Sequence, residues 1–384
     1  MNSACFTTLA APSRPAARAL RAALLAFPVL GASACADTAT GPSQRRVETV
    51  LADVMARHPV PAMAAAVIRD GGIVAQGAIG VRRLGSSEPV GVRDRFHIAS
   101  NVKAMTATMI ATLVEDGKLR WTTTPTEVFP ELAAGMHPQL RGATVEQLLQ
   151  HRAGLAPYET LDEILALPVF TGNATQQRLA FAAYLLQRPP AVAPGTYLYS
   201  NGGYDVAAAM AERVSGRSWE TLMQERLFAP LGMQATRGWP AALDPNQPWG
   251  HEWTGTTFQP TDPNGPFQMP DILAAAGDLS LSLQDYARFV QLHLRGARGH
   301  ARLVSKESFV RLQTPNGDYA LGWVVGMLGG SPFLGHEGTS GSFHATVLIF
   351  PTRNIAVVVL VNGGGGPAPI AAGEAALELA GITP

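Results

Sequence analysis

Residues 343–361 read FHATVLIFPTRNIAVVVLV and carry a pronounced strand pattern. Two apolar runs rich in β-branched residues, 343–350 and 355–361, are separated by Pro351-Thr352-Arg353-Asn354. Short runs of this kind, joined by residues that favour turns, predict two β-strands in a hairpin. The end of the chain is therefore expected to contribute neighbouring strands to a sheet.

The N-terminal part of the chain has a matching pattern. Runs 64–68 and 73–79 flank a turn at Asp70-Gly71, which predicts a second hairpin over residues 62–81. Apolar residues at helical spacing precede it between 47 and 55, and a closing helix is expected over 370–379. These patterns predict an α+β fold, in which an antiparallel β-sheet is flanked by N- and C-terminal helices.

The middle of the chain is expected to be a mainly helical inserted domain over residues 121–284, between the two parts of the sheet domain, 43–120 and 285–384. Gly216 and Gly296 stand where helix C-caps are expected. Segment 239–270 is rich in Pro, Asn and Gly without periodicity, which predicts a long ordered loop. Helical patterns cover 100–115, 179–186, 204–214, 219–227 and 283–294.

The composition limits the classes of partner. The 384 residues are 47% hydrophobic and 15% charged, which suits a sizeable core. Lys+Arg and Asp+Glu both number 29, so the balance gives no electrostatic reason to expect a nucleic-acid partner. The histidines are scattered and no C-x-x-C occurs, so neither a metal site nor a cofactor is expected.

The N-terminus resembles an export signal over residues 1–36. A basic stretch precedes the apolar run 22–30, which is too short to span a bilayer, and Ala32-Ser33-Ala34 follows. No other segment predicts a transmembrane helix. Cys35 stands where a lipobox cysteine receives lipid, although Ala32 replaces the usual leucine. Two outcomes stay open, a lipid anchor at Cys35 or simple cleavage near Ala34 or Ala36, and both predict an exported protein, periplasmic or lipid-anchored at the bacterial envelope.

The chain has a single S-x-x-K motif, Ser100-Asn101-Val102-Lys103. It opens a predicted helix, and residues three apart on a helix share a face, so the lysine amine is expected beside the serine hydroxyl. A hydroxyl alone is a poor nucleophile and needs an adjacent base. Burial of the lysine would lower its pKa enough for that task.

Two further motifs carry polar groups suited to the same chemistry. Tyr199-Ser200-Asn201 lies on a short connection before the predicted 204–214 helix, where a phenol and an amide can move a proton and bind a substrate. His336-Glu337-Gly338 stands among glycines at the start of a strand, where a substrate backbone can approach closely.

In this order, S-x-x-K, Y-x-N and H-x-G resemble the penicillin-recognising serine hydrolases. The similar branch contains class C β-lactamases, D-alanyl-D-alanine carboxypeptidases, D-aminopeptidases and β-lactamase-like esterases. The likeness extends from residue 43 to about 380. Connecting segments share it, namely LLQHRAGL at 148–155, PG at 194–195 and LFAPLGM at 227–233.

The resemblance implies three catalytic roles. Ser100 is the nucleophile and forms an acyl-enzyme, and Lys103 activates it. Tyr199 relays the proton to the leaving group and helps to activate the deacylating water. The family's class A members carry a glutamate-bearing loop for deacylation, and no such stretch is found in this sequence.

The resemblance also implies how the substrate is bound. Asn201 contacts the substrate's acyl-side amide, and His336 stabilises charge near Tyr199. Gly338 lets the substrate approach the strand, and the backbone N–H groups of Ser100 and Thr339 form the oxyanion hole.

The third motif departs from the family's antibiotic-hydrolysing members, where it usually reads K-T-G or K-S-G and attracts a carboxylate. His336 is mostly neutral at pH 7, and an ionised Glu337 facing the site would repel a carboxylate. The sequence therefore favours a peptidase, amidase or esterase acting on a small acyl or D-amino-acid substrate. Three alternatives stay open: a class C-type β-lactamase, a non-catalytic binding or sensor protein of the same fold, and a metal-dependent hydrolase, which the ligand spacing disfavours.

Overall fold

A six-stranded antiparallel sheet organises the computed structural model, which describes residues 47–266 and 268–382. The predicted export signal and Cys35 lie outside these residues. In spatial order the strands are β2 (Gly72–Gly80), β1 (Ala62–Arg69), β11 (Ile355–Val361), β10 (His344–Phe350), β9 (Ser331–Thr339) and β8 (Val324–Leu328).

The N- and C-terminal hairpins meet at the centre of this sheet. Strand β1 pairs with β11, so that Met63 lies opposite Val361. The turn of the first hairpin falls at Asp70 and Gly71, and Asn354 closes the second with a left-handed φ of +50°. The prediction of an antiparallel sheet formed from both ends of the chain is confirmed.

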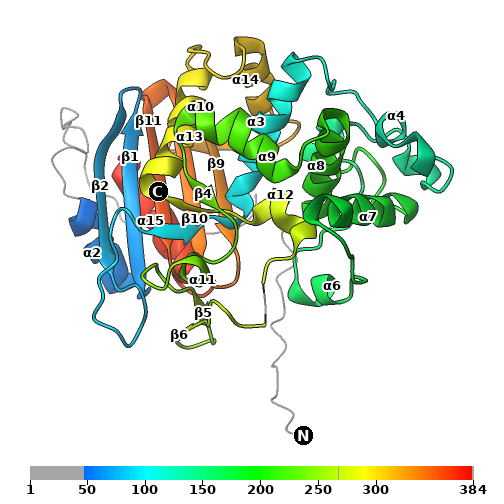
Figure 1. The fold of residues 1–384 in the computed structure, drawn as a ribbon. Helices are drawn as coiled ribbons and strands as arrows, with labels where there is room; N and C mark the ends of the chain where they lie inside the picture. Colours follow the sequence, from blue (N-terminus) through cyan, green and yellow to red (C-terminus); the bar gives the residue numbers. More distant parts are fainter. Residues whose placement is uncertain (1–46, 267, 383–384) are drawn as a thin grey trace, which may run out of the picture.

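Helices cover both faces of the sheet. Helices α2 (Val47–Arg57) and α15 (Ala368–Ala380) pack on one face, and α13 (Leu283–Ala297) packs on the other (Figure 1). Along β1, Met63 and Ala65 belong to the core on the α2 side, whereas Ala64 and Ala66 belong to the core on the α13 side. Because both faces are buried, the central strands are continuously apolar instead of alternating.

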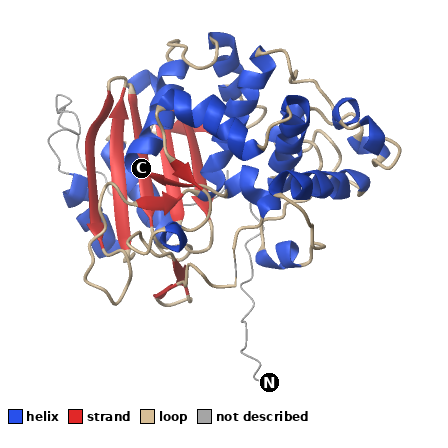
Figure 2. Ribbon diagram, viewed as in Figure 1, coloured by secondary structure: helices blue, strands red, loops and turns tan. Residues whose placement is uncertain are grey.

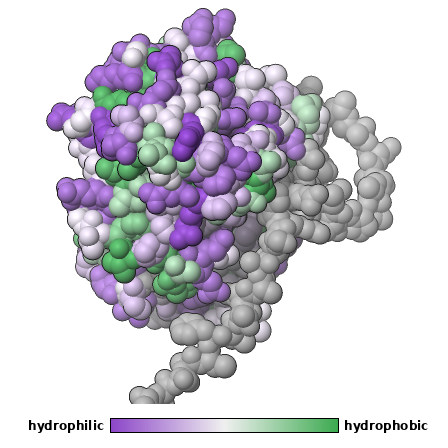
Figure 3. Space-filling view, turned by 90° about the vertical axis from the view of Figure 1, so that its right-hand side faces the viewer, coloured by the Kyte–Doolittle hydropathy of each residue, from purple (hydrophilic) through white to green (hydrophobic). Residues whose placement is uncertain are grey.

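The remaining helices gather beside the sheet (Figure 2). Helix α3 (Val102–Glu115) lies between the sheet and this group of helices, and it is buried from Val102 to Leu113. From the helical side, the surface is mainly hydrophilic with separate hydrophobic patches (Figure 3). The other α-helices of the described residues are α4 (Pro125–Val128), α5 (Val145–Leu149), α6 (Leu161–Leu165), α7 (Ala174–Gln187), α8 (Asn201–Ser215), α9 (Trp219–Met223), α10 (Ala229–Leu231), α11 (Pro240–Leu243), α12 (Ala274–Gly277) and α14 (Lys306–Gln313).

Short strands complete the described part of the chain. Strands β3 (Arg95–His97), β7 (Ser280–Ser282) and β4 (Ala235–Thr236) form one small sheet, and β5 (His251–Trp253) pairs with β6 (Phe258–Pro260). Segment 239–270, expected to be a loop, therefore contains the β5–β6 hairpin and helix α11. These pieces are three or four residues long, too short to show a period in the sequence.

The two glycines expected as helix C-caps differ. Gly216 caps α8 with φ of +68°, as predicted. The C-cap prediction for Gly296 is wrong, because α13 continues through it to Ala297 and Arg298 follows as the C-cap. A Cβ on Gly296 would lie 2.3 Å from Cδ1 of Phe309, so this glycine allows α13 and α14 to pack closely. None of the helices in the described residues is long and apolar enough to cross a membrane.

Candidate active site

Ser100 lies in a short 3₁₀ turn, Ala99–Asn101, that leads from β3 into α3. The residue before it, Ala99, has a left-handed φ of +44°, a conformation that costs a non-glycine residue free energy. A hydrogen bond from the Ile98 amide to the Leu279 carbonyl, 2.9 Å long, holds this entry to the helix. Ser100 is partly exposed, whereas its neighbours on both sides are buried.

Lys103 lies one helical turn beyond Ser100 and is fully buried. Its Nζ is 3.0 Å from Ser100 Oγ, 2.7 Å from Asn201 Oδ1 and 2.9 Å from the Ala276 carbonyl oxygen. Burial disfavours the ammonium form and lowers the pKa of Lys103 to about 7. The amine can therefore lose its proton near neutral pH, at hydrogen-bonding distance from the hydroxyl.

Asn201 begins α8 and reaches Lys103 from the helical part of the molecule. Its Nδ2 donates to the Tyr158 carbonyl at 2.8 Å, which turns Oδ1 toward the lysine. The amide expected to contact a substrate is thus engaged at both ends within the protein, and its oxygen orients the Lys103 amine.

Tyr199 lies above the lysine, with Lys103 Nζ 4.8 Å from the centre of its ring. The side chain is 4% exposed. Burial raises the pKa of the phenol well above 10, and the hydrogen bond with the Ser100 hydroxyl offsets part of that rise. The phenol therefore holds its proton at neutral pH and lies beside Ser100.

Strand β9 brings the third motif against the start of α3. A Cβ on Gly338 would lie 2.3 Å from the Ile98 carbonyl oxygen and 2.8 Å from the Ser100 amide nitrogen. Glycine at this position lets the strand approach the Ser100 backbone directly. Thr339 follows at the exposed end of the strand.

The His336 ring is committed to protein partners. Its Nδ1 donates to the Glu337 carbonyl at 2.6 Å, so Nε2 accepts from the Tyr319 hydroxyl at 2.9 Å. Burial lowers the pKa of His336 to about 3, which keeps the ring neutral. The ring centres of His336 and Tyr199 are 6.5 Å apart. The predicted charge-stabilising role therefore meets a neutral ring whose two nitrogens are both occupied.

The side chain of Glu337 is not placed as the repulsion hypothesis required. Side chains alternate along a strand, so Glu337 lies on the opposite face of the sheet from His336 and Gly338, beside its cross-strand neighbour Thr346. Burial raises the pKa of its carboxyl to about 7. Direct repulsion of a substrate carboxylate is correspondingly weakened.

Helix α12, which provides the Ala276 carbonyl acceptor of Lys103, is held by hydrogen bonds from neighbouring helices. Within α12, the Ala275 carbonyl accepts from Thr106 Oγ1 of α3 at 2.8 Å, and the next carbonyl, of Ala276, accepts from Lys103. Trp219 Nε1 donates to the same Thr106 hydroxyl at 3.2 Å. Helices α3, α9 and α12 are thereby joined around the lysine.

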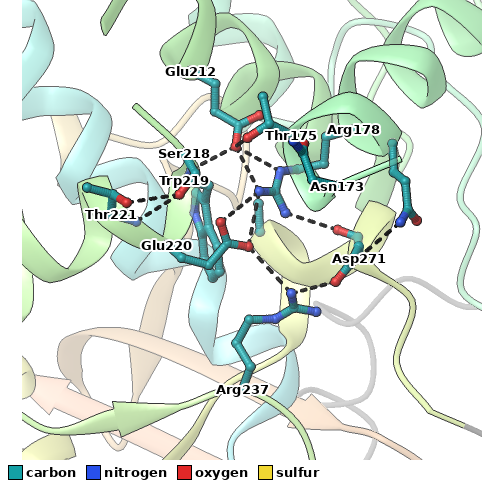
Figure 4. Close-up of polar contacts among 12 residues, drawn as sticks. Asn173, Thr175, Arg178, Glu212, Ser218, Trp219, Glu220, Thr221, Arg237 and Asp271 are labelled. Carbon is teal, nitrogen blue, oxygen red and sulfur yellow. Dashed lines mark hydrogen bonds and ion pairs between the residues drawn. The ribbon is translucent and has the colours of Figure 1, made fainter. Parts of the chain in front are cut away.

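A buried arginine extends this support (Figure 4). Arg178 of α7 is fully buried, and its Nη2 lies 2.7 Å from Glu212 Oε1 of α8 and 2.9 Å from Glu220 Oε2 of α9. Its Nη1 donates to the Asp271 carbonyl at 3.2 Å, just before α12. Arg237 continues the cluster by pairing with the Asp271 carboxylate at 2.6 Å (Figure 4). The network ties three helices to the segment that positions the lysine's carbonyl acceptor.

Several contributors could not be found from the sequence. The Ala276 carbonyl is a backbone group, which no residue type signals. The left-handed backbone conformation of Ala99 cannot be predicted from the sequence either, because alanine does not favour that conformation. Tyr319 lies 17 residues before His336 on a separate segment, and only folding brings its hydroxyl to the ring. Within residues 47–266 and 268–382, no group of three or more His, Cys, Asp or Glu side chains could hold a metal ion.

Comparisons with known proteins find similar chains and similar solved structures. Penicillin-binding protein 4 of Amycolatopsis lactamdurans is 28% identical over 323 residues, covering 80% of this chain and 82% of that protein. Unguisins hydrolase ungD of Aspergillus violaceofuscus is 26% identical over 339 residues, covering 79% of this chain but only 58% of that protein.

The octameric penicillin-binding protein homologue from Pyrococcus abyssi has a similar solved structure. It matches with a TM-score of 0.71 at 25% identity, covering 87% of this chain and 77% of that chain. The family model described as Beta-lactamase matches residues 47–381, a range that contains the whole six-stranded sheet and the Ser100–Lys103 pair. The chain therefore belongs to the beta-lactamase family of serine hydrolases.

Proposed function

We propose that this protein hydrolyses small amide or ester substrates through an acyl-enzyme on Ser100, with Lys103 as the base and Tyr199 as the proton relay. The observation that carries the proposal is the set of three partners around the Lys103 amine. Two of them, Asn201 Oδ1 and the Ala276 carbonyl oxygen, can only accept a hydrogen bond. The third is the Ser100 hydroxyl.

A neutral amine has two N–H donors and one lone pair. The two acceptors take both N–H groups, so the lone pair is directed at the Ser100 hydroxyl, as a general base requires. The lowered pKa of Lys103, about 7, makes this neutral form available near neutral pH. Amine and hydroxyl are already at reacting distance, which supports direct proton transfer.

The proposed reaction balances its protons within these three groups. Ser100 Oγ attacks the carbonyl carbon while its proton passes to Lys103. When the bond to the leaving group breaks, Tyr199 gives its phenolic proton to that group, and the Lys103 ammonium replaces it. Water then attacks the acyl-enzyme by the same route and releases the acid. The raised pKa of Tyr199 supports this role, because the phenol is protonated when the leaving group departs.

The environment of β9 supports an amide or ester substrate over efficient β-lactam hydrolysis. The neutral, fully engaged His336 offers no positive charge to an antibiotic carboxylate. Glu337 adds none either and lies on the other face of the sheet. The unguisins hydrolase relative, named as a hydrolase, is compatible with acyl transfer to water. A small acyl or D-amino-acid compound therefore remains the favoured substrate class.

Covalent labelling tests the proposal. Purified protein is incubated with a fluorophosphonate and with a fluorescent penicillin, beside a Ser100→Ala variant. We expect labelling by at least one probe and none in the variant. Absence of labelling by both probes would favour the non-catalytic sensor. A panel of p-nitrophenyl esters, D-amino-acid amides and nitrocefin then ranks substrates, and efficient nitrocefin turnover would favour the β-lactamase alternative.

Export is proposed on the leader pattern alone. We expect the mature protein outside the cytoplasm, lipid-anchored at Cys35 or released by cleavage near Ala34 or Ala36. Mass spectrometry of the mature N-terminus separates these outcomes. A lipid-modified Cys35 supports the anchor, and an unmodified chain beginning at Asp37 excludes it.

A further inference from the structure

His151 forms hydrogen bonds with the backbone on both sides of Tyr199. Its carbonyl oxygen accepts the amide hydrogen of Leu198 at 2.9 Å, and its ring nitrogen Nδ1 accepts that of Ser200 at 3.0 Å. These two amides belong to the residues directly before and after the tyrosine. A single residue from a different segment thus fixes the backbone that carries the phenol.

The same ring packs against the tyrosine itself. The ring centres of His151 and Tyr199 are 4.2 Å apart, with 33° between the planes. Tyr319 and Tyr204 enclose His151 at 4.7 and 5.3 Å. The histidine is 2% exposed, so its position is defined by packing as well as by hydrogen bonds.

Two features of His151 are energetically unfavourable, namely its backbone conformation and one of its ring nitrogens. His151 has a left-handed φ of +59°, which is unfavourable for a residue with a Cβ. Because Nδ1 accepts a hydrogen bond, the ring proton resides on Nε2, and that atom is buried without a hydrogen-bond partner in the described part of the chain. A strained residue with an unsatisfied polar atom persists where the surrounding structure needs its geometry.

We infer that His151 is a positioning residue, which holds the Tyr199 phenol against Ser100 through two backbone hydrogen bonds and one ring contact. It does not touch the reacting atoms. The inference rests on the proposed function, because it concerns the tyrosine that would protonate the leaving group. It also explains a residue of the 148–155 segment to which the sequence assigned no chemistry.

A positioning role predicts an effect that depends on the leaving group. A p-nitrophenolate departs without needing a proton, whereas an alkoxide needs the phenolic proton of Tyr199. A displaced phenol should therefore slow a methyl ester much more than the p-nitrophenyl ester of the same acid. A residue that only stabilises the fold would lower both rates equally, in proportion to the folded protein.

Two substitutions separate the contacts. His151→Phe keeps a ring but leaves the Ser200 amide without its acceptor. His151→Asn keeps an acceptor near the position of Nδ1 and tolerates the left-handed backbone, but it removes the ring contact. Another fully buried histidine, His293, bonds to Thr108 and lies outside the site, so His293→Asn is the matched control.

We expect the ratio of methyl-ester to p-nitrophenyl-ester kcat/KM, which reports acylation without the shared deacylation step, to fall about 10- to 100-fold in His151→Phe and about 3- to 10-fold in His151→Asn. Tyr199→Phe removes the phenol and so gives the largest expected fall in this ratio. Adding His151→Phe to Tyr199→Phe should lower the ratio no further. The ratio should stay at the wild-type value in His293→Asn, even where stability drops.

A ratio within about twofold of wild type in every folded His151 variant would overturn the inference. If His151→Phe does not fold, His151→Asn decides the question alone. The outcome is separable from failure of the proposed function, since wild-type protein that is not labelled at Ser100 contradicts that function, whatever the His151 variants do.

Discussion

Lys103 occupies a position where a charged amine is costly. It is fully buried on α3, and the neutral oxygens of Ser100, Asn201 and Ala276 are its only hydrogen-bond partners among the described residues. Carboxylates act on it only at longer range, and desolvation outweighs their effect. The protein thereby avoids a stable ion pair that would keep the lysine protonated. This single feature converts an ordinary lysine into a candidate base.

The lowered pKa of Lys103 predicts a pH dependence for acylation. Below about 7 the amine is protonated and cannot accept the serine proton, and above it the amine is free. The value of kcat/KM should therefore rise with pH, with an apparent pKa near 7, and then level off. Stopped-flow acylation by a p-nitrophenyl ester measures the profile.

Glu337 titrates in the same range and provides the control. Its carboxyl has a pKa raised to about 7, so Glu337→Gln should keep the rise if Lys103 causes it. Lys103→Met should lose about 10²- to 10⁴-fold in rate. A rise that disappears in Glu337→Gln would show that Lys103 is not the titrating group. A rise centred near 10, the ordinary pKa of a lysine, would show that burial does not lower the pKa of Lys103.

At the scale of elements, the close contact between β9 and the start of α3 defines the site. Gly338 makes this contact possible, because any Cβ would clash with the Ile98 carbonyl and crowd the Ser100 amide. The strand edge and the helix entry come from distant parts of the sequence. The distance between β9 and the start of α3 is therefore set by the tertiary structure, and the proposed reaction depends on it.

Gly338→Ala should push β9 away from the Ser100 backbone. We expect labelling of Ser100 to fall at least about tenfold, because misplacement by an ångström disrupts a reactive geometry. Gly335→Ala is the matched control, since a Cβ there crowds Val347, Leu348 and Phe333 but not Ser100. The control should lose stability while folded protein keeps its labelling rate. Equal labelling rates in both folded variants would contradict this prediction.

A second element contact lies between α13 and α14. Gly296→Ala improves helix propensity by about 1 kcal/mol, yet the new Cβ would meet the Phe309 ring at 2.3 Å. Overpacking of this kind costs about 1–3 kcal/mol, so we expect a net loss of stability in urea denaturation. Adding Phe309→Leu should relieve part of the loss. A variant more stable than wild type would show that the helices separate at little cost.

At the scale of the whole molecule, a network of buried charged side chains connects helices α7, α8 and α9 to helix α12 next to Lys103. Arg178 is paired with Glu212 and Glu220, and its contact with the Asp271 carbonyl reaches the start of α12 (Figure 4). Removal of one partner from a buried pair leaves an uncompensated charge, which is more costly than the loss of an exposed pair.

Arg178→Met should therefore lower the free energy of unfolding by about 3–5 kcal/mol. Arg217 pairs with Glu225 at the surface, with both side chains about half exposed, and serves as the control. Arg217→Met should cost less than about 1 kcal/mol. Urea denaturation compares the two variants. Similar losses in both would show that the buried network contributes no more than a surface pair.

Local sequence pattern was sufficient to predict the two hairpins, the terminal helices and the antiparallel sheet. Strand periodicity, turn residues and helical spacing are properties of neighbouring residues, so they can be read along the chain. The proximity of Ser100 and Lys103 belongs to the same class, because one helical turn separates them. The motifs of Tyr199 and His336 were recognisable, but their distances from Ser100 were not.

Tertiary structure alone decided how those groups are used. It placed the Ala276 carbonyl on the lysine, gave both nitrogens of His336 to protein partners and turned Glu337 to the far face of the sheet. It also brought His151 to the backbone of Tyr199. The physical reason is that pKa, tautomer and orientation depend on burial and on partners distant in sequence, and these exist only once the chain has folded.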